Sequence, residues 1–145
     1  MRKFILLLAI LGMSGCATMG ALRGPSKEMD DAALLVREKK FPEAVAVYKK
    51  IQLESPRTPL AAEAMYEAAL LHASADNPQR DYQQAIRLFE DFLKQYHGNK
   101  RAHEARTWIS QLKTIQDLKK ENERLKMDIE QLKQLDIRHE ERRKK

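Results

Sequence analysis

Two stretches of the chain, Phe41-Pro-Glu-Ala-Val-Ala-Val-Tyr48 and Tyr82-Gln-Gln-Ala-Ile-Arg-Leu-Phe89, repeat one pattern at an offset of 41 residues. In each, an aromatic residue is followed by an alanine three positions later and by a second aromatic seven positions later. Apolar residues at these spacings form one stripe along a helix, and the alanine leaves room for a neighbouring helix to approach closely. The sequence therefore predicts a repeated helical unit whose core contains Phe41, Ala44, Tyr48, Tyr82, Ala85 and Phe89.

The match extends beyond these stretches. Ala61-x-Glu63-Ala64 returns as Ala102-x-Glu104-Ala105 at the same offset. Thr58-Pro59 is typical of a helix start, and Gly98-Asn99 is typical of a break between helices. These signals predict helices over about 27–39, 42–54, 59–73, 81–96 and from 100 onward.

The composition agrees with an all-α protein. Charged residues make up 33% of the chain and aromatic residues 6%, with no alternating β-branched pattern of the kind that marks strands. Loss of Arg2 and Lys3 with residues 1–15 would lower the formal net charge from +6 to +4. This excess is small and evenly spread, so we expect no nucleic-acid partner.

The first sixteen residues follow the order of a bacterial export signal. Arg2 and Lys3 precede the apolar run 4–11, which is much shorter than the about 20 residues that a membrane-spanning helix needs. Ser14-Gly15 and the lone Cys16 follow, and together they resemble the lipobox of bacterial lipoproteins, with Met13 where leucine is usual. The resemblance implies a signal peptide over 1–15 and a lipid on Cys16 that anchors the protein to a membrane.

The residues after the cysteine predict the membrane in which the protein is anchored and the nature of the segment that follows the anchor. In lipoproteins an aspartate directly after the lipidated cysteine favours the inner membrane, whereas Ala17 stands here. The resemblance therefore implies the periplasmic face of the outer membrane. Residues 16–26, with two glycines and a proline and no periodicity, are predicted to be a flexible tether.

The repeated pattern over 27–112 resembles the tetratricopeptide repeat and is similar to that of envelope proteins of the BamD and YbgF types. The resemblance implies a short superhelical array of helix pairs that binds other polypeptides and has no chemistry of its own. The period of 41 residues is longer than the usual length of about 34, and only about two and a half repeats are present. A helical bundle without repeats is the alternative.

A heptad pattern occupies residues 113–137. Leucines recur at one core position of the heptad, and an asparagine lies between two isoleucines at the other. This pattern favours a parallel pair of helices, formed by two copies of the chain or with another helical protein. The acidic Glu121 and Asp128 would face Lys126 and Lys133 of such a partner. The alternatives are a helix that folds back on the repeats and a solitary exposed helix. The predicted coiled-coil core contains Ile115, Leu118, Asn122, Leu125, Ile129 and Leu132.

The register slips after Leu132, and residues 138–145 form a basic tail. Leu132-x-x-Leu135-Asp136-Ile137-Arg138 with the basic residues after it is similar to the coiled-coil end of QseG-type lipoproteins. That resemblance implies an accessory role beside a periplasm-sensing histidine kinase.

No catalytic motif emerges. The four histidines His72, His97, His103 and His139 are scattered, and no phosphate-binding loop or nucleophile motif is present. We therefore expect no catalytic residue, cofactor, metal or small-molecule substrate. The leading hypothesis is a non-enzymatic, lipid-anchored periplasmic adaptor in envelope assembly or maintenance. The alternatives are the histidine-kinase accessory and a purely structural envelope spacer.

Overall fold

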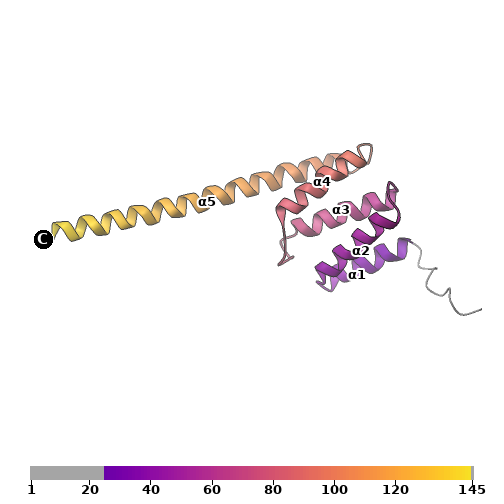
Figure 1. Ribbon diagram of the computed structural model, residues 1–145, viewed down its shortest axis with the longest axis horizontal. Coiled ribbons are helices and arrows are strands. Elements are labelled where there is room, and N and C mark those ends of the chain that lie inside the picture. The colour runs from indigo at the N-terminus through magenta and orange to yellow at the C-terminus, as the bar shows by residue number, and fades with distance from the viewer. Residues whose placement is uncertain (1–24, 145) are drawn as a thin grey trace, which may run out of the picture.

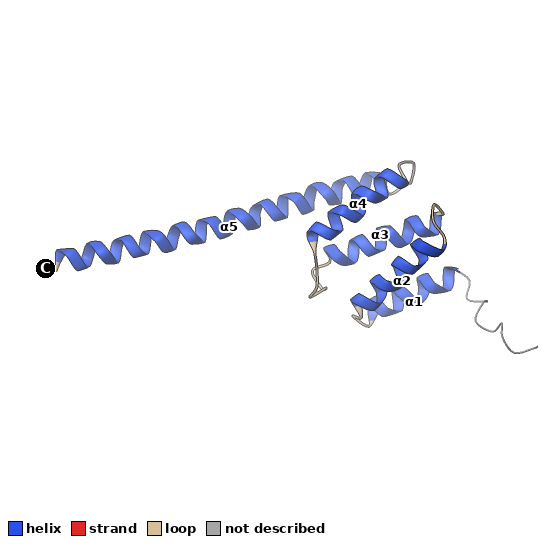
Figure 2. Cartoon of the chain, viewed as in Figure 1, coloured by secondary structure: helices blue, strands red, loops and turns tan. Residues whose placement is uncertain are grey.

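A computed structural model of the chain describes residues 25–144, all of whose regular elements are α-helices (Figure 2). The predicted signal peptide, Cys16 and the tether up to residue 24 lie outside the described residues. The prediction that the tether continues through residues 25–26 is wrong, because these residues form the start of the first helix. Each predicted helix agrees with an observed one to within two residues at the ends that were predicted. The helices are α1 (Pro25–Arg37), α2 (Phe41–Glu54), α3 (Pro59–Ala73), α4 (Tyr82–Gln95) and α5 (Ala102–Arg143).

Successive helices run antiparallel, and each packs mainly against its neighbours in sequence (Figure 1). We call the packed part of the molecule, from α1 to the first three turns of α5, the array. The rest of α5 extends away from it. The start of α1 and the end of α5 lie at opposite ends of the molecule (Figure 1).

Local capping explains where α3 and α4 begin. The Oγ1 of Thr58 accepts a hydrogen bond from the backbone N–H of Ala61 at 3.1 Å, with Pro59 as the first helical residue. The Asp81 carboxylate accepts one from the N–H of Gln84 at 2.9 Å. Each cap satisfies an N–H that has no partner inside its helix, which fixes the starting residue.

The turn between α1 and α2 closes with a Schellman motif. The N–H of Lys40 donates to the carbonyl of Leu35 at 2.9 Å, and the N–H of Lys39 donates to that of Val36 at 3.0 Å. Lys39 has a φ of 59°, in the left-handed region that glycine usually occupies in this motif. The motif reverses the chain so that α2 returns along α1.

Helix α3 is the centre of the array and is buried on both sides. Its residues Ala64, Ala68 and Leu71 belong to one apolar cluster with α1 and α2. Met65, Tyr66 and Ala69 belong to a second cluster with α4 and α5. A helix that carries apolar residues on two faces suits this central position, and its alanines permit close packing on either side.

The six residues predicted for the repeat core either belong to these two clusters or pack against them. Five of them are buried, whereas Tyr82 is partly exposed and packs against the edge of the second cluster. The five buried residues are Phe41, Ala44, Tyr48, Ala85 and Phe89.

Helix α5 is a single element of 42 residues, and at 1.5 Å per residue it is about 60 Å long. It contains the end of the array, the heptad segment 113–137 and the basic residues up to Arg143 without a break. No backbone feature separates the array from the heptads, so the packed first turns of α5 determine the direction of the extended part.

Candidate interaction surface on the C-terminal helix

Beyond Leu112, α5 carries large apolar side chains that nothing in the described chain covers. Their exposed fractions run from 41% at Ile115 to 65% at Leu118, and Asn122 is exposed among them. A continuous exposed apolar surface of this kind marks a site of association. We call the residues predicted for the coiled-coil core the stripe: Ile115, Leu118, Asn122, Leu125, Ile129 and Leu132.

The stripe lies on a different side of α5 from the residues that hold this helix in the array. Ala105 and Leu112 are buried against α4, and beyond them Gln116, Lys119 and Lys120 line a groove shared with the start of α4. By helical geometry the stripe runs about a third of a turn away from the line through Ala105 and Leu112. Packing of α5 on the array therefore leaves the whole stripe accessible.

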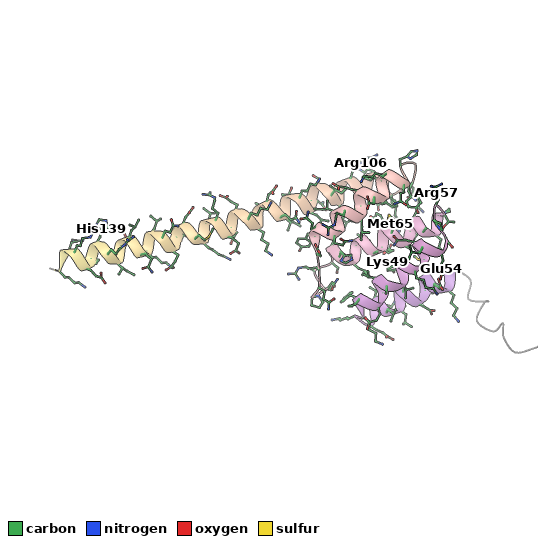
Figure 3. The ribbon with its side chains drawn as sticks, viewed as in Figure 1. Lys49, Glu54, Arg57, Met65, Arg106 and His139 are labelled. Atoms are coloured by element: carbon green, nitrogen blue, oxygen red, sulfur yellow. The ribbon has the colours of Figure 1, made fainter. Side chains whose placement is uncertain are left out.

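The described chain does not fold back on itself to cover the stripe. Figure 3 shows side chains leaving α5 on all sides as far as His139, with no other helix beside them. The fold-back alternative is thus not the arrangement found. Within one chain, the extended part of α5 is an exposed helix with an unpartnered apolar face.

Charged residues flank the stripe in two columns of opposite sign. Lys119, Lys126 and Lys133 lie on one side, and Glu121 and Asp128 lie on the other. Each column is formed by residues seven apart, so it follows the stripe along the helix.

Within one helix, residues of both columns form ion pairs with neighbouring side chains. The Arg124 guanidinium lies 3.1 Å from the Asp128 carboxylate and also pairs with Glu121. Its hydrogen bond lowers the pKa of Glu121, although slight desolvation opposes the shift. On the basic side, Lys126 pairs with Glu123 at 3.0 Å. All these groups are well exposed, so the pairs contribute little to stability and can exchange partners readily.

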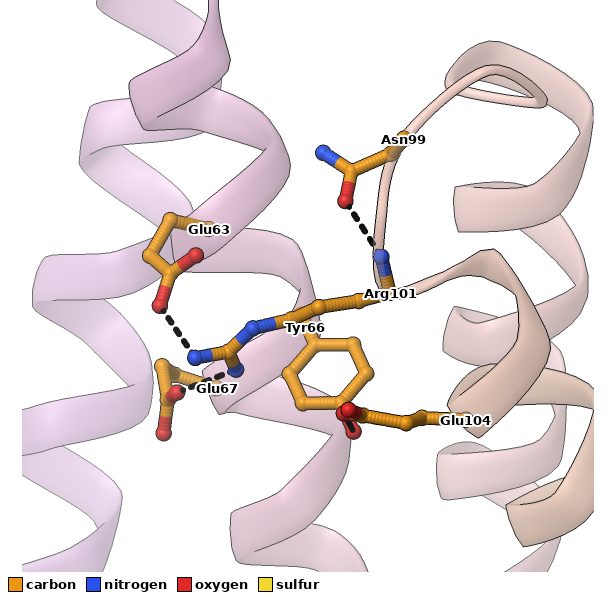
Figure 4. Close-up of polar contacts among 6 residues, drawn as sticks. All are labelled: Glu63, Tyr66, Glu67, Asn99, Arg101 and Glu104. Carbon is orange, nitrogen blue, oxygen red and sulfur yellow. Dashed lines mark hydrogen bonds and ion pairs between the residues drawn. The ribbon is translucent and has the colours of Figure 1, made fainter.

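At its other end, α5 is fixed to the array by a polar cluster around Arg101 (Figure 4). The Arg101 guanidinium lies 2.9 Å from Glu63 and 3.0 Å from Glu67, both on α3. The same group lies over the ring of Tyr66, whose hydroxyl donates to the Glu104 carboxylate at 3.0 Å. We call these five residues the Arg101 cluster. It joins α3 to α5 across the intervening helix.

Burial and nearby carboxylates favour the protonated form of two tyrosines close to these glutamates, Tyr48 and Tyr66. Desolvation raises the pKa of Tyr66, and the hydrogen bond to Glu104 adds to the effect. Burial, with Glu67 and Glu63 nearby, raises the pKa of Tyr48 to about 12. Both tyrosines therefore remain neutral at physiological pH. Tyr48 packs in the core, and Tyr66 packs and also donates its hydrogen bond to Glu104.

The Arg101 cluster is absent from the residues that the sequence pattern predicted. One signal for it was present, because Glu63 and Glu104 are the same position of the repeated pattern and both belong to the cluster. Arg101 aligns with the apolar Leu60 at the 41-residue offset, so the repeated pattern gives no signal for a charged residue there. Its partners lie 34 and 38 residues away in sequence, and only tertiary packing brings them together.

The described residues hold no group of three or more histidine, cysteine, aspartate or glutamate side chains arranged to bind a metal ion. His97, His103 and His139 are exposed and well separated, and His72 is half-buried at the end of α3. Within residues 25–144, no helix is both long and apolar enough to cross a membrane.

The predicted site residues are thus distributed over three places. The repeat-core residues lie inside the array, the stripe lies on the extended helix, and Cys16 falls outside the described residues. Comparisons of the chain with protein-family models, with curated proteins and with solved structures find no match.

Proposed function

We propose that this chain is a lipid-anchored adaptor of the bacterial envelope that binds other proteins and carries out no chemistry itself. In this proposal Cys16 holds the lipid, the array binds one polypeptide and the stripe of α5 binds a helix. The observation that carries the proposal is the exposed stripe, since a folded chain that leaves so much apolar surface uncovered on one face is built to associate.

The array is proposed to be tetratricopeptide-like. Support comes from burial at positions 41 residues apart. Ala44 and Ala85 are both fully buried, and Tyr48 and Phe89 are buried at 3% and 0% exposure. These equivalent positions are buried alike, as in stacked copies of one unit, although Tyr82 is more exposed than its counterpart Phe41. A stack of this kind presents the outward faces of its helices to an extended partner.

The shape of the molecule suits an anchored protein. The start of α1 follows the proposed tether and lies at the end of the molecule remote from the tip of α5 (Figure 1). A lipid at Cys16 would therefore hold the array near the membrane while α5 extends about 45 Å beyond the array, at 1.5 Å per residue after Leu112. Several acyl chains on one residue would hold the protein stably.

The anchor is tested by replacing Cys16 with serine in the full chain. We expect radiolabelled palmitate to enter the unchanged chain and not the variant, and the variant to leave the membrane fraction. Separation of inner from outer membranes then tests the proposed location. Labelling of the Cys16→Ser variant would disprove the lipid attachment.

The adaptor role is tested with a photocrosslinking amino acid placed in the full chain inside cells. Lys49 and Arg106 are exposed on the array (Figure 3), and Ile137 is exposed near the end of α5. An adaptor gives discrete protein products from at least one of the array positions. Products from Ile137 alone would favour the histidine-kinase accessory, and no products from any position would favour the envelope spacer.

A further inference from the structure

We infer that the occupant of the stripe is the stripe of a second copy of this chain, aligned in parallel and in register. This inference rests on the proposed function only in taking the stripe to be a helix-binding surface, and it names the helix. Three features support this pairing: the exposure of the stripe, the charges that flank it and the single asparagine within it.

Charge decides the direction of pairing. In a parallel pair the acidic column of one helix faces the basic column of the other, so Glu121 lies against Lys126 of the copy and Asp128 against Lys133. In an antiparallel pair each column would face its own copy. Lysines 119, 126 and 133 would then oppose three further lysines, and the two carboxylates would oppose two others. Only the parallel arrangement is complementary on both flanks.

Asn122 decides the register. In an in-register parallel pair its amide meets the amide of its copy, and the two can form hydrogen bonds with each other. A shift by one heptad would place the amide against Ile115 or Ile129 instead. A buried amide without a partner is costly, so the aligned register is favoured over its neighbours.

The array does not obstruct this pairing. Ala105, Leu112 and Gln116 face α4, and Lys119 at the start of the basic column lines the groove beside it, whereas the apolar residues of the stripe are all at least 41% exposed. The internal pairs of Arg124 and Lys126 are exposed and exchange at little cost. A parallel pair also places both arrays at the same end of the coiled coil, so that two anchors can insert into one membrane and two array surfaces face one partner.

Cysteine crosslinking of the full chain in its own membrane tests the pairing. Leu118→Cys and Leu132→Cys each place a thiol in the stripe, and Met127→Cys places one on the opposite side of the same turns as the matched control. The unchanged chain, with Cys16 as its one cysteine, gives the background. After oxidation with copper phenanthroline, we expect both stripe variants to form disulfide-linked dimers at least tenfold more than the control.

The same variants report direction. In an antiparallel pair centred on the stripe, position 118 and its copy would lie about 20 Å apart, so neither stripe variant would link to itself. Only a mixture of the Leu118→Cys and Leu132→Cys chains would then link. Such a result, or equal linking of all three positions, would overturn the inference.

A charge exchange tests complementarity, with Leu118→Cys in every chain. One chain carries Lys119→Glu, Lys126→Glu and Lys133→Glu, so both of its columns are acidic. Another carries Glu121→Lys and Asp128→Lys, so both are basic. We expect dimers of either chain alone to fall at least tenfold and a mixed dimer to form when the two are produced together. Retained self-linking of either chain would contradict the proposed contacts.

Failure of this inference differs from failure of the proposed function. If stripe cysteines link the chain to another protein and never to itself, the adaptor role stands and the second copy is wrong. If the chain links to itself while the array positions give no crosslinked protein, the dimer stands and the adaptor role fails.

Discussion

The guanidinium of Arg101 lies 4.5 Å from the centre of the Tyr66 ring, and this contact fixes the N-terminal end of α5, which Arg101 precedes, to the middle of α3. Helix α4 lies between α3 and α5 in sequence and packs against both. The Arg101 cluster is therefore a direct side-chain link between helices that share little backbone contact. Because α5 is one rigid element, this link helps to set the direction in which the stripe extends.

Replacing Arg101 with alanine should lower the free energy of unfolding by about 1–2 kcal/mol. The loss combines a cation–π contact worth about 0.5–1 kcal/mol with two ion pairs that solvent screens, since the side chain is partly exposed. Arg101→Lys should lose less, because the charge remains while the paired geometry is lost. Urea unfolding followed by the fluorescence of the single tryptophan, Trp108, measures both.

The matched control for this prediction is Arg106→Ala, at an exposed position one turn further along α5. A surface substitution there should change stability by less than about 0.5 kcal/mol. If Arg101→Ala behaves like Arg106→Ala, the cluster has no part in fixing α5.

Enlarging the buried alanines should disturb both halves of the array equally. Ala44 and Ala85 are fully buried at equivalent positions of the repeated pattern. Ala44→Leu and Ala85→Leu should each lower the free energy of unfolding by about 1–3 kcal/mol, because the extra atoms have no space between closely packed helices. Thermal unfolding by circular dichroism checks this.

Ala46 provides the control, because it is exposed on the same helix as Ala44. Ala46→Leu should leave the melting temperature nearly unchanged. A large cost at only one of the two buried alanines would show that the equivalence of the two units is limited to their sequence.

Much of the fold could be predicted because the signals were local. Apolar spacing and the caps at Thr58 and Asp81 act within one helix, so they are readable without knowledge of the tertiary structure. The difference between Phe41 and Tyr82 could not be read this way. Phe41 is buried in the cluster that includes Ala32 of α1, whereas Tyr82 lies at the edge of the groove from which α5 leaves the array.

The candidate site shows the same division. The heptad pattern identified the stripe, because the spacing of its residues is a property of one helix. Its exposure could not be predicted in the same way, because it depends on whether another part of the chain packs against α5. Arg101 could not be identified, because its role depends on Glu63 and Glu67 arriving from α3. Lys39 could not be assigned a left-handed conformation either, because lysine seldom adopts it and the turn imposes it.

The Lys39 conformation leads to a stabilising substitution. Lys39 occupies the position of the Schellman motif where glycine avoids the steric cost of a positive φ. Lys39→Gly should therefore raise the free energy of unfolding by about 1 kcal/mol. Lys49→Gly, in the middle of α2, should lower it by about 1 kcal/mol. Urea unfolding of the two variants would contradict the assigned turn if both were destabilised.

His72 should make the array less stable in mild acid. Desolvation lowers the pKa of this half-buried histidine below its ordinary value of 6.5, and Asp81 offsets the shift only in part. The unfolded chain therefore binds a proton at a higher pH than the folded chain does. Protonation then favours unfolding, so the contribution of His72 to stability is present above pH 6.5 and is lost as the pH falls from there toward the folded-state pKa.

Unfolding free energies at pH 7.5 and 5.5 should differ less in His72→Gln than in the unchanged chain. His103→Gln, at an exposed position, should keep the full difference, and an equal effect of the two substitutions would exclude His72 as the source.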